Sequence, residues 1–424
     1  MRTPVASLLL ATLAALLLAG CGGGSKDGPQ FKYEAVVEAD TGSPRLFLYR
    51  YFDEDASRRV ELTWETPLPP DPQRPLPAPL PSFESAPANA GPQGVRVLLD
   101  VLSAELSTRG IPKGQVPVSV LGLDAMRGLF YRNPTAAAQI YASVRQTVGE
   151  AGYATRYAAT LSGDANGVFL WAGANDRFGN LAPNRATNGV IGIGSTGAQV
   201  TYAAAERAGV SVGIPVTVRG QAYRVYSVSY EGLGYDEARR RMITGGGSGS
   251  GTGLNNCYPS NAARAAPLAY NPGVAGLSIG AGNFVFETCS ALYESVVRDS
   301  AVSRTVAVPG FESTDFLIPD ALDISLLGVA LAPGDLLARL NSLCEGPDAW
   351  SLRIQPRAGA GLGAQNLCAD GTFLHTFLFG PNGVNAAASR TGFIRQIEGL
   401  PPRASQGFVL LGGSLTGVGS VWIQ

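Results

Sequence analysis

The chain has 424 residues, of which 45% are hydrophobic and only 15% are charged, and its formal net charge is −1. The balance of 32 basic and 33 acidic residues argues against nucleic-acid binding, which usually depends on a strongly cationic surface. A single histidine excludes a zinc site built on several histidines. The apolar share is sufficient for a buried core, and the 54 glycines and 29 prolines predict many tight turns and long loops.

Residues 1–20 have the pattern of a cleaved export signal, because Arg2 precedes an apolar run that is too short to span a bilayer. The run ends in Leu-Ala-Gly-Cys, which resembles a bacterial lipobox and implies acylation of Cys21 with fatty acids such as palmitate. Such chains anchor a protein in the lipid bilayer. Gly22 favours the outer membrane, with the protein facing the periplasm or the cell surface, and residues 21–30 read as a flexible tether. An ordinary secretory signal is the alternative.

The first part of the mature chain predicts a hairpin, then further strands and helices. Polar and apolar residues alternate on both sides of a small-residue turn at 40–44. Asn133 and Pro134 suit the cap and first position of a helix. The expected elements are a hairpin over 31–52, a strand at 60–64, an extended Pro-rich excursion at 67–92, helices at 93–108 and 134–149, a strand at 116–121 and a Gly-Asp-Ala-Asn-Gly turn at 163–167.

A second hairpin, formed by residues 190–202, repeats the first at an offset of 154 residues. This offset lays Thr41 on Ser195 and Arg45 on Gln199, and it suggests a duplicated fold with lobes at 31–186 and 187–424. Backbone N–H groups in turns of Gly, Ser and Thr can converge on an anion. Two such turns facing each other across a cleft would bind a chain of phosphates. Plain hairpin turns of the same composition are the alternative.

Sequence patterns in the second part of the chain predict a loop, a further hairpin, several helices and a strand. A Gly-rich and Ser-rich loop at 245–256 is expected to lack fixed structure. His375 lies in an apolar, strand-like run and is interpreted as structural. The other expected elements are a hairpin at 216–230, helices from 235, 289 and 333, and a strand near 409–411 in a final segment that is a candidate for return to the first lobe.

Four cysteines remain after Cys21, and an even number in an exported chain predicts two disulfides. Of the three possible pairings we favour the sequential one, Cys257 with Cys289 and Cys344 with Cys368.

Five motifs occur in order along the chain, of which the first is Glu-Ala-Asp-Thr-Gly-Ser-Pro-Arg at 38–45, followed by Tyr49-Arg50. The others lie at 122–127, 162–175, 192–199 and 226–239. Together they resemble the ecto-nucleoside triphosphate diphosphohydrolases, the apyrase family, over residues 33–412. The resemblance implies two ribonuclease-H-like α/β lobes of the actin-like superfamily with an interlobe cleft. It also implies phosphate binding by Thr41, Gly42, Ser43, Arg45, Gly194, Ser195, Thr196 and Gly197.

The chemistry implied by the resemblance is hydrolysis of a nucleoside di- or triphosphate with Mg²⁺ or Ca²⁺, in which a carboxylate deprotonates the attacking water. Asn166 occupies the position of the catalytic Glu, and an amide cannot accept this proton at neutral pH. Gly192 stands where the family has a metal-associated Asp, which leaves Glu38 as the remaining acid of that set. Gln199 matches the residue that orients the water.

Three interpretations follow from these departures. In a diverged hydrolase, Asp40, Asp124 or Asp164 supplies the missing carboxylate, and Asp164 is favoured because it shares a turn with Asn166. In a pseudoenzyme, the cleft binds nucleotides with impaired hydrolysis, which is the interpretation we favour. In a structural lipoprotein, the lobes are a scaffold and the Pro-rich and Gly-rich insertions contact a protein partner. Neither that partner nor the preferred base follows from the sequence.

Overall fold

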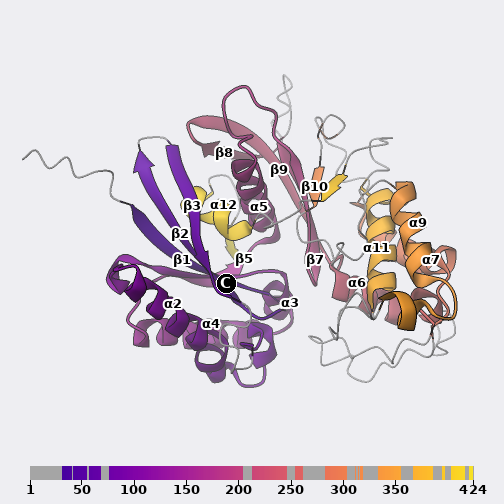
Figure 1. The fold of residues 1–424 in the computed structure, drawn as a ribbon, viewed down its shortest axis with the longest axis horizontal. Helices are drawn as coiled ribbons and strands as arrows, with labels where there is room; N and C mark the ends of the chain where they lie inside the picture. Colours follow the sequence, from indigo (N-terminus) through magenta and orange to yellow (C-terminus); the bar gives the residue numbers. More distant parts are fainter. Residues whose placement is uncertain are drawn as a thin grey trace, which may run out of the picture.

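Two six-stranded mixed sheets dominate the computed structural model (Figure 1). Their strand orders are β12-β5-β4-β1-β2-β3 and β11-β10-β6-β7-β9-β8. The structure describes residues 31–40, 42–54, 57–67, 76–203, 213–245, 254–260, 282–302, 311, 314, 316–318, 333–354, 366–384, 394–396, 403–415 and 420–423.

The first sheet combines an antiparallel hairpin with parallel strands, and three helices cover one of its faces. Its strands are β1 (Lys32–Ala39), β2 (Arg45–Glu54), β3 (Ser57–Glu65), β4 (Val118–Gly122), β5 (Thr155–Leu161) and β12 (Trp422–Ile423). The helices are α2 (Arg96–Thr108), α3 (Asp124–Arg132) and α4 (Pro134–Glu150). As predicted, Asn133 caps α4, with its Oδ1 accepting the N–H of Ala136 at 3.1 Å.

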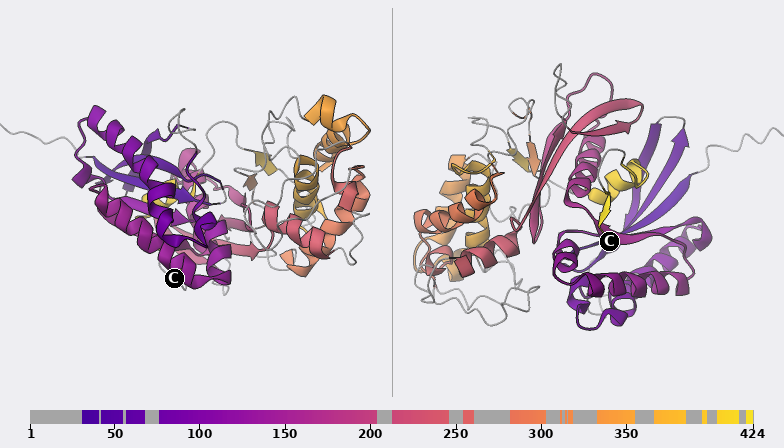
Figure 2. Two further views of the ribbon diagram at one scale, coloured as in Figure 1. Left: turned by 90° about the horizontal axis from the view of Figure 1, so that it is seen from below. Right: turned by 180° about the vertical axis from the view of Figure 1, so that it is seen from behind.

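The second sheet repeats this plan, and its helical layer lies at the far end of the molecule from the first lobe (Figure 2). Its strands are β6 (Gly189–Ile193), β7 (Gly197–Ala203), β8 (Ile214–Val218), β9 (Gln221–Glu231), β10 (Phe316–Ile318) and β11 (Ile394–Gln396). The covering helices are α6 (Tyr235–Gly245), α7 (Phe286–Asp299), α9 (Pro333–Cys344) and α11 (Leu367–Phe379).

The two hairpins keep the same strand register. Glu38 of β1 pairs with Arg45 of β2, and Gly192 of β6 pairs with Gln199 of β7. These are the positions that the sequence offset superimposes. A shared register places equivalent residues of the two halves at equivalent points of their sheets, as a duplicated fold requires.

Two helices, α5 (Gly163–Arg177) and α12 (Ala404–Leu410), pack against each other between the sheets (Figure 1). α5 contacts β6, β7 and β9, whereas α12 returns to contact β1, β2 and β3. Glycines permit this crossing, because a Cβ on Gly407 would lie 1.8 Å from the carbonyl oxygen of Phe169. After α12, β12 pairs with the far edge of β5.

Several predicted elements are wrong in type. The residues predicted as a turn at 163–167 begin α5, because Ser162 caps the helix by accepting the N–H of Ala165 at 3.3 Å. His375 lies in α11 rather than in a strand, and 409–410 end the helix α12. Both helices are buried on nearly every side, so their apolar runs lack the amphipathic period that distinguishes a helix from a strand.

The Pro-rich excursion is only partly extended in the described residues. It contains the short helices η1 (Leu80–Phe83) and η2 (Pro87–Asn89), and η3 (Ala90–Val95) leads into α2. Leu80 and Phe83 belong to the core beneath the first sheet. Most of the Gly-rich loop predicted at 245–256 lies outside the described residues, and its last residues belong to the short helix η5 (Leu254–Cys257). Two further short helical turns are η4 (Lys113–Gln115) and η8 (Ala349–Ile354).

Both predicted disulfides are present. Cys257–Cys289 joins η5 to α7, and Cys344–Cys368 joins α9 to α11. Cys21 and the tether lie outside the described residues. Within the described part of the chain, no helix combines the length and apolar character needed to cross a membrane.

Candidate functional site

The turn that follows β1, here called the first turn, and the turn that begins at Gly194 after β6, here called the second turn, meet between the two lobes. Asp40, directly after β1, accepts hydrogen bonds through Oδ1 from Ser195 Oγ at 3.3 Å and from the N–H of Ala125 at 2.8 Å. The carboxyl ends of parallel strands in an α/β sheet commonly form such a crevice. Thr41 lies outside the described residues, so its position in this arrangement is not assigned.

A cavity of about 120 Å³ lies at this meeting point. It brings together the predicted residues Glu38, Asn166, Gly194 and Gln199 with the candidate acids Asp40 and Asp124. The remaining walls are Leu123, Leu170, Gly192, Ile193, Arg403 and Ala404. Residues from both lobes and from the central helices therefore converge on one small polar space.

Of the residues predicted to bind phosphate in the first turn, the structure describes Gly42, Ser43 and Arg45, and none of these three lines the cavity. Ser43 is half-buried and Gly42 is exposed. Arg45 forms an ion pair with Glu65 at 3.2 Å and lies over the ring of Phe47. Of the predicted phosphate-binding residues that the structure describes, Gly194 alone lines this cavity, whereas Thr196 lines the larger groove described below.

A chain of hydrogen-bonded side chains crosses the cavity wall. Asn166 Nδ2 donates to Gln199 Oε1 at 3.2 Å, and Gln199 Nε2 donates to Asp124 Oδ1 at 3.3 Å. Asn166 is buried because it lies one turn into α5, on the face packed against the second sheet. The amide of Gln199, predicted to orient water, is thus engaged at both its oxygen and its nitrogen by protein groups.

Asp124 is held in place by a buried arginine. Arg127, one turn further along α3, pairs with Asp124 and donates from Nη1 to the carbonyl oxygen of Leu161 at 3.3 Å. Its Nε reaches across the cleft to Glu231 at 3.0 Å. The guanidinium is fully buried, so this set of contacts fixes the Asp124 carboxylate and links the two lobes.

Leu170 occupies the space beside Gly192, where the apyrase resemblance places an Asp side chain. A Cβ built on Gly192 would lie 2.8 Å from Leu170 Cδ2. An Asp at this position would therefore require Leu170 to move.

The acids of the cavity are not arranged as a ready-made metal site. No group of three or more His, Cys, Asp or Glu side chains suited to a metal ion occurs among the described residues. Glu38, the predicted metal residue, accepts the N–H of Ser405 at 2.9 Å. Asp40 and Asp124 are engaged by hydrogen-bond donors and by Arg127, so a resident divalent cation does not fit this donor set as it stands.

Asp164, the favoured substitute base, does not line the cavity. It lies in the first turn of α5, where the residue is exposed although its carboxyl group packs against β9. Burial of that carboxyl raises its pKa, and the nearby Glu231 charge acts in the same direction. The N–H of Ser229 and the charge of Arg127 oppose this shift.

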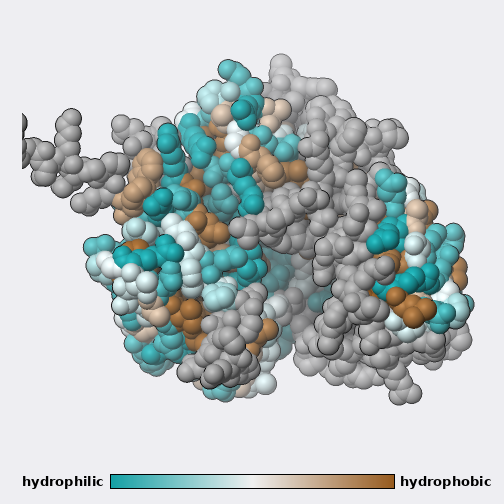
Figure 3. Space-filling view, viewed as in Figure 1, coloured by the Kyte–Doolittle hydropathy of each residue, from teal (hydrophilic) through white to brown (hydrophobic). Residues whose placement is uncertain are grey.

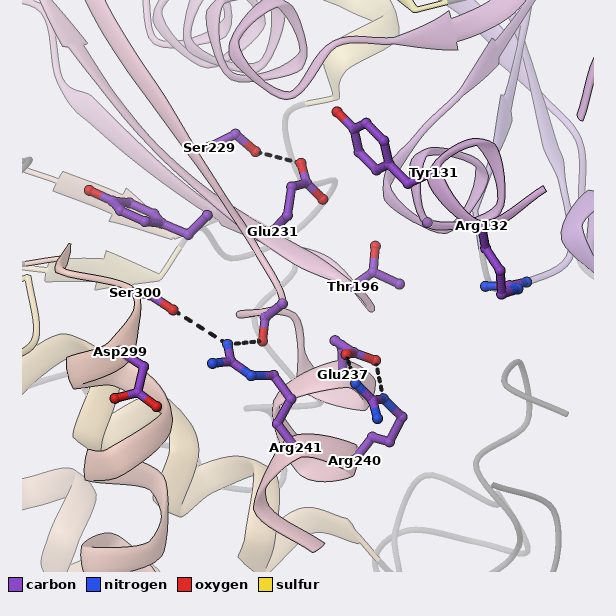
Figure 4. Close-up of a pocket in the computed structure, with 13 residues that line it drawn as sticks. Tyr131, Arg132, Thr196, Ser229, Glu231, Glu237, Arg240, Arg241, Asp299 and Ser300 are labelled. Atoms are coloured by element: carbon purple, nitrogen blue, oxygen red, sulfur yellow. Dashed lines mark hydrogen bonds and ion pairs between the residues drawn. The ribbon is translucent and has the colours of Figure 1, made fainter. Parts of the chain in front are cut away.

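A larger groove of about 670 Å³ begins beside the second turn at Thr196 (Figure 4). Tyr131 and Arg132 of α3 face it from one side, and α6 faces it from the other. Arg240 pairs there with Glu237, and Arg241 donates to Ser300 Oγ at 3.4 Å. A hollow between the two sides of the molecule is visible in Figure 3, and the residues at its back are mainly hydrophilic.

Sequence reasoning missed three charged residues of the site. Arg127 and Glu231 lie inside the recognised motifs, where their charges could have drawn attention. Arg403 lines the cavity from the start of α12, with its guanidinium 4.3 Å from the centre of the Phe47 ring. No motif marks Arg403, and only the return of α12 to the first sheet brings it here.

Comparison with known proteins agrees with this arrangement. The profile of the GDA1/CD39 (nucleoside phosphatase) family matches residues 26–299. The chain belongs to this family. The two-lobed α/β fold expected from the apyrase resemblance is confirmed as well. A solved structure of nucleoside triphosphate hydrolases from Neospora caninum has a TM-score of 0.59, with 14% identity and 96% coverage of both chains.

Relatives of the GDA1/CD39 family match shorter stretches. Ectonucleoside triphosphate diphosphohydrolase 2 of Rattus norvegicus is 26% identical over 234 residues, or 51% of this chain and 45% of the relative. Probable apyrase 5 of Arabidopsis thaliana is 26% identical over 155 residues, or 36% of this chain and 32% of the relative. These matches thus span less than half the length of each relative.

Proposed function

We propose that this protein binds nucleoside di- and triphosphates in the interlobe cleft and hydrolyses them slowly or not at all. One observation carries the proposal: the buried Asn166 amide donates to Gln199 at the point where the family pattern calls for a carboxylate. A carboxamide can hold a water molecule by hydrogen bonds but cannot remove its proton. General base catalysis typically contributes about 10²–10⁴-fold to a rate, and a loss of this size is expected here.

The small cavity and the larger groove suggest where the phosphates and the nucleoside of a bound nucleotide would lie. The small polar cavity is lined by Gly194, where the second turn begins, and backbone N–H groups of such a turn suit a phosphate. The groove of about 670 Å³ adjoins the same turn at Thr196 and has the size of ordinary ligand pockets, about 300–1,000 Å³. We place the nucleoside in this groove, between α3 and α6.

Mg²⁺ or Ca²⁺ would neutralise phosphate charge in such a complex. Because the described residues offer no preassembled metal group, the cation is expected to arrive already bound to the nucleotide. We further propose that acylated Cys21 anchors the protein in the outer membrane, facing the periplasm or the cell surface. Mass spectrometry of the mature amino terminus, with Cys21→Ser as the control, tests the anchor.

The nucleotide proposal is tested on purified full-length protein with ATP and ADP, in Mg²⁺, Ca²⁺ or chelator. Thermal stabilisation by nucleotide with little phosphate release is the expected result, because a ligand that binds only the folded state stabilises it. Rapid metal-dependent release would instead establish an active hydrolase. Absence of both effects, with a protein partner recovered by crosslinking, would favour the scaffold interpretation.

A further inference from the structure

Two acidic side chains of the first lobe occupy the second turn. Asp124 Oδ2 lies so close to Gly194 that a Cβ on this glycine would be 1.8 Å away. Asp40 accepts the hydroxyl of Ser195, and the carbonyl oxygen of Asp124 accepts the hydroxyl of Thr196 at 2.7 Å. The side-chain donors of this turn are therefore already engaged, and their acceptors come from the opposite lobe.

A bound phosphate would need the same donors. The Asp40 carboxylate and a phosphate oxygen are both anionic acceptors, so they compete for the Ser195 hydroxyl. The Asp124 carboxylate competes for space instead, because its Oδ2 lies against Gly194. A phosphate that entered beside Asp40 and Asp124 would also meet two like charges at short range. The cavity volume of about 120 Å³ is below the range of about 300–1,000 Å³ that small-molecule ligands normally require.

The contacts that place Asp124 also hold the lobes together. Arg127 is fully buried and binds Asp124 on its own helix while it pairs with Glu231 of β9. Gln199 of β7 donates to the Asp124 side chain. Moving Asp124 out of the second turn therefore requires the lobes to separate or α3 to shift.

We propose that Asp40, which accepts the Ser195 hydroxyl, and Asp124, which fills the space beside Gly194, act together as internal ligands of the second turn that compete with nucleotide phosphate and keep the cleft closed. This inference rests on the proposed nucleotide binding. It assigns to these acids a role in limiting affinity, which is the opposite of the catalytic role that their position in a phosphatase-like cleft would first suggest.

The decisive experiment measures ADP binding by isothermal titration calorimetry for wild-type protein and the Asp124→Ala variant, in Mg²⁺ and in chelator. The variant is expected to bind ADP at least about tenfold more tightly, which corresponds to about 1.4 kcal/mol. Asp100→Ala is the matched control, because it removes an exposed acid of α2 that lines neither the cavity nor the groove. Its affinity is expected to stay within about twofold of wild type.

Asp124→Ala leaves Arg127 without one of its buried partners, and the variant could unfold for that reason. Asp40→Ala removes the carboxylate that accepts the Ser195 hydroxyl while the Asp124–Arg127 pair stays in place, and it is expected to increase ADP affinity as well. Circular dichroism verifies that each variant is folded. If wild type binds ADP but neither folded variant binds it more tightly, the internal-ligand proposal is overturned and the proposed function stands. If wild type and every folded variant fail to bind ADP, both proposals are wrong. Binding by the variants alone supports the internal ligand.

Discussion

The two lobes share a sheet plan but differ in what stabilises the helical layer on each sheet. Beneath the first sheet, α2, α3 and α4 cover a core made of hydrophobic side chains, which includes Leu98, Leu102 and Ile140. Against the second sheet, the described helices enclose both disulfides and a buried arginine. A conserved strand register therefore does not require a conserved means of stabilising the layer above it.

The second layer contains a buried polar cluster. Arg239 of α6 pairs with Asp370 of α11 and with Asp236. Burial raises the pKa of Asp370 to about 7, with the Asp236 charge acting in the same direction and Arg239 opposing both. The hydroxyls of Tyr258 and Tyr293 are buried without a hydrogen-bond partner among the described residues. Burial of these polar groups carries a desolvation cost, as burial of Arg127 does in α3 of the first layer.

Reduction of the disulfides is expected to have the largest effect on stability and to distinguish the two helical layers most clearly. The bonds close loops with separations of 32 and 24 residues, and each is expected to contribute about 3–4 kcal/mol through the entropy of the unfolded chain. Hydrogen exchange after reduction should therefore increase in α7, α9 and α11 while α2 and α4 remain protected. Equal loss of protection in both layers would show that they unfold as one cooperative unit.

The next largest effect on stability is expected where α5 and α12 pack against each other between the lobes. Gly407→Ala is expected to destabilise the protein by about 1–3 kcal/mol, because its Cβ would meet backbone atoms of α5. Gly149→Ala in α4 is the matched control: a Cβ there meets nothing within 4 Å, and Ala favours the helix by up to about 1 kcal/mol. Urea denaturation measures both variants. A tolerated Gly407→Ala would mean that α5 and α12 can separate at little cost.

The buried Asp370 predicts a smaller, pH-dependent effect. Its pKa is near 7 in the folded protein and 3.8 ordinarily, so the folded state keeps a proton that the unfolded chain loses between these pH values. Stability from this group therefore falls as pH rises from about 4 to about 7. Asp370→Asn should remove about 1–2 kcal/mol of that dependence, measured as urea midpoints at about pH 5 and about pH 7. An unchanged slope in the variant would contradict the assignment.

The smallest effect, a change in phosphate release, is expected for substitutions that restore carboxylates near Gly192. The first lobe has Glu38 where the second has Gly192. Asn166→Glu alone should not restore full phosphate release, because the carboxylate at Gly192 would still be missing and Leu170 fills its space. Adding Gly192→Asp with Leu170→Ala is the informative comparison. Robust release by the single variant would show that a working metal site already exists.

The sequence predicted the hairpins, the capped helix α4, the disulfide pairs and the family, because these depend on local patterns. Periodicity failed for α11 and α12, where burial on nearly all sides removes the polar face. Local reasoning also favoured Asp164 for its nearness to Asn166 in the chain, whereas the cavity brings in Asp124 through Gln199. Arg403 could not be found at all, since only long-range packing carries it to the cleft.

The return of α12 and β12 to the first sheet has a consequence for how the molecule is made. Residues 404–423 complete a lobe whose other strands were synthesised at the start of the chain. During synthesis, the sheet of the first lobe can therefore be completed only after the C-terminal strand has been made, so the lobe that begins first cannot be finished first.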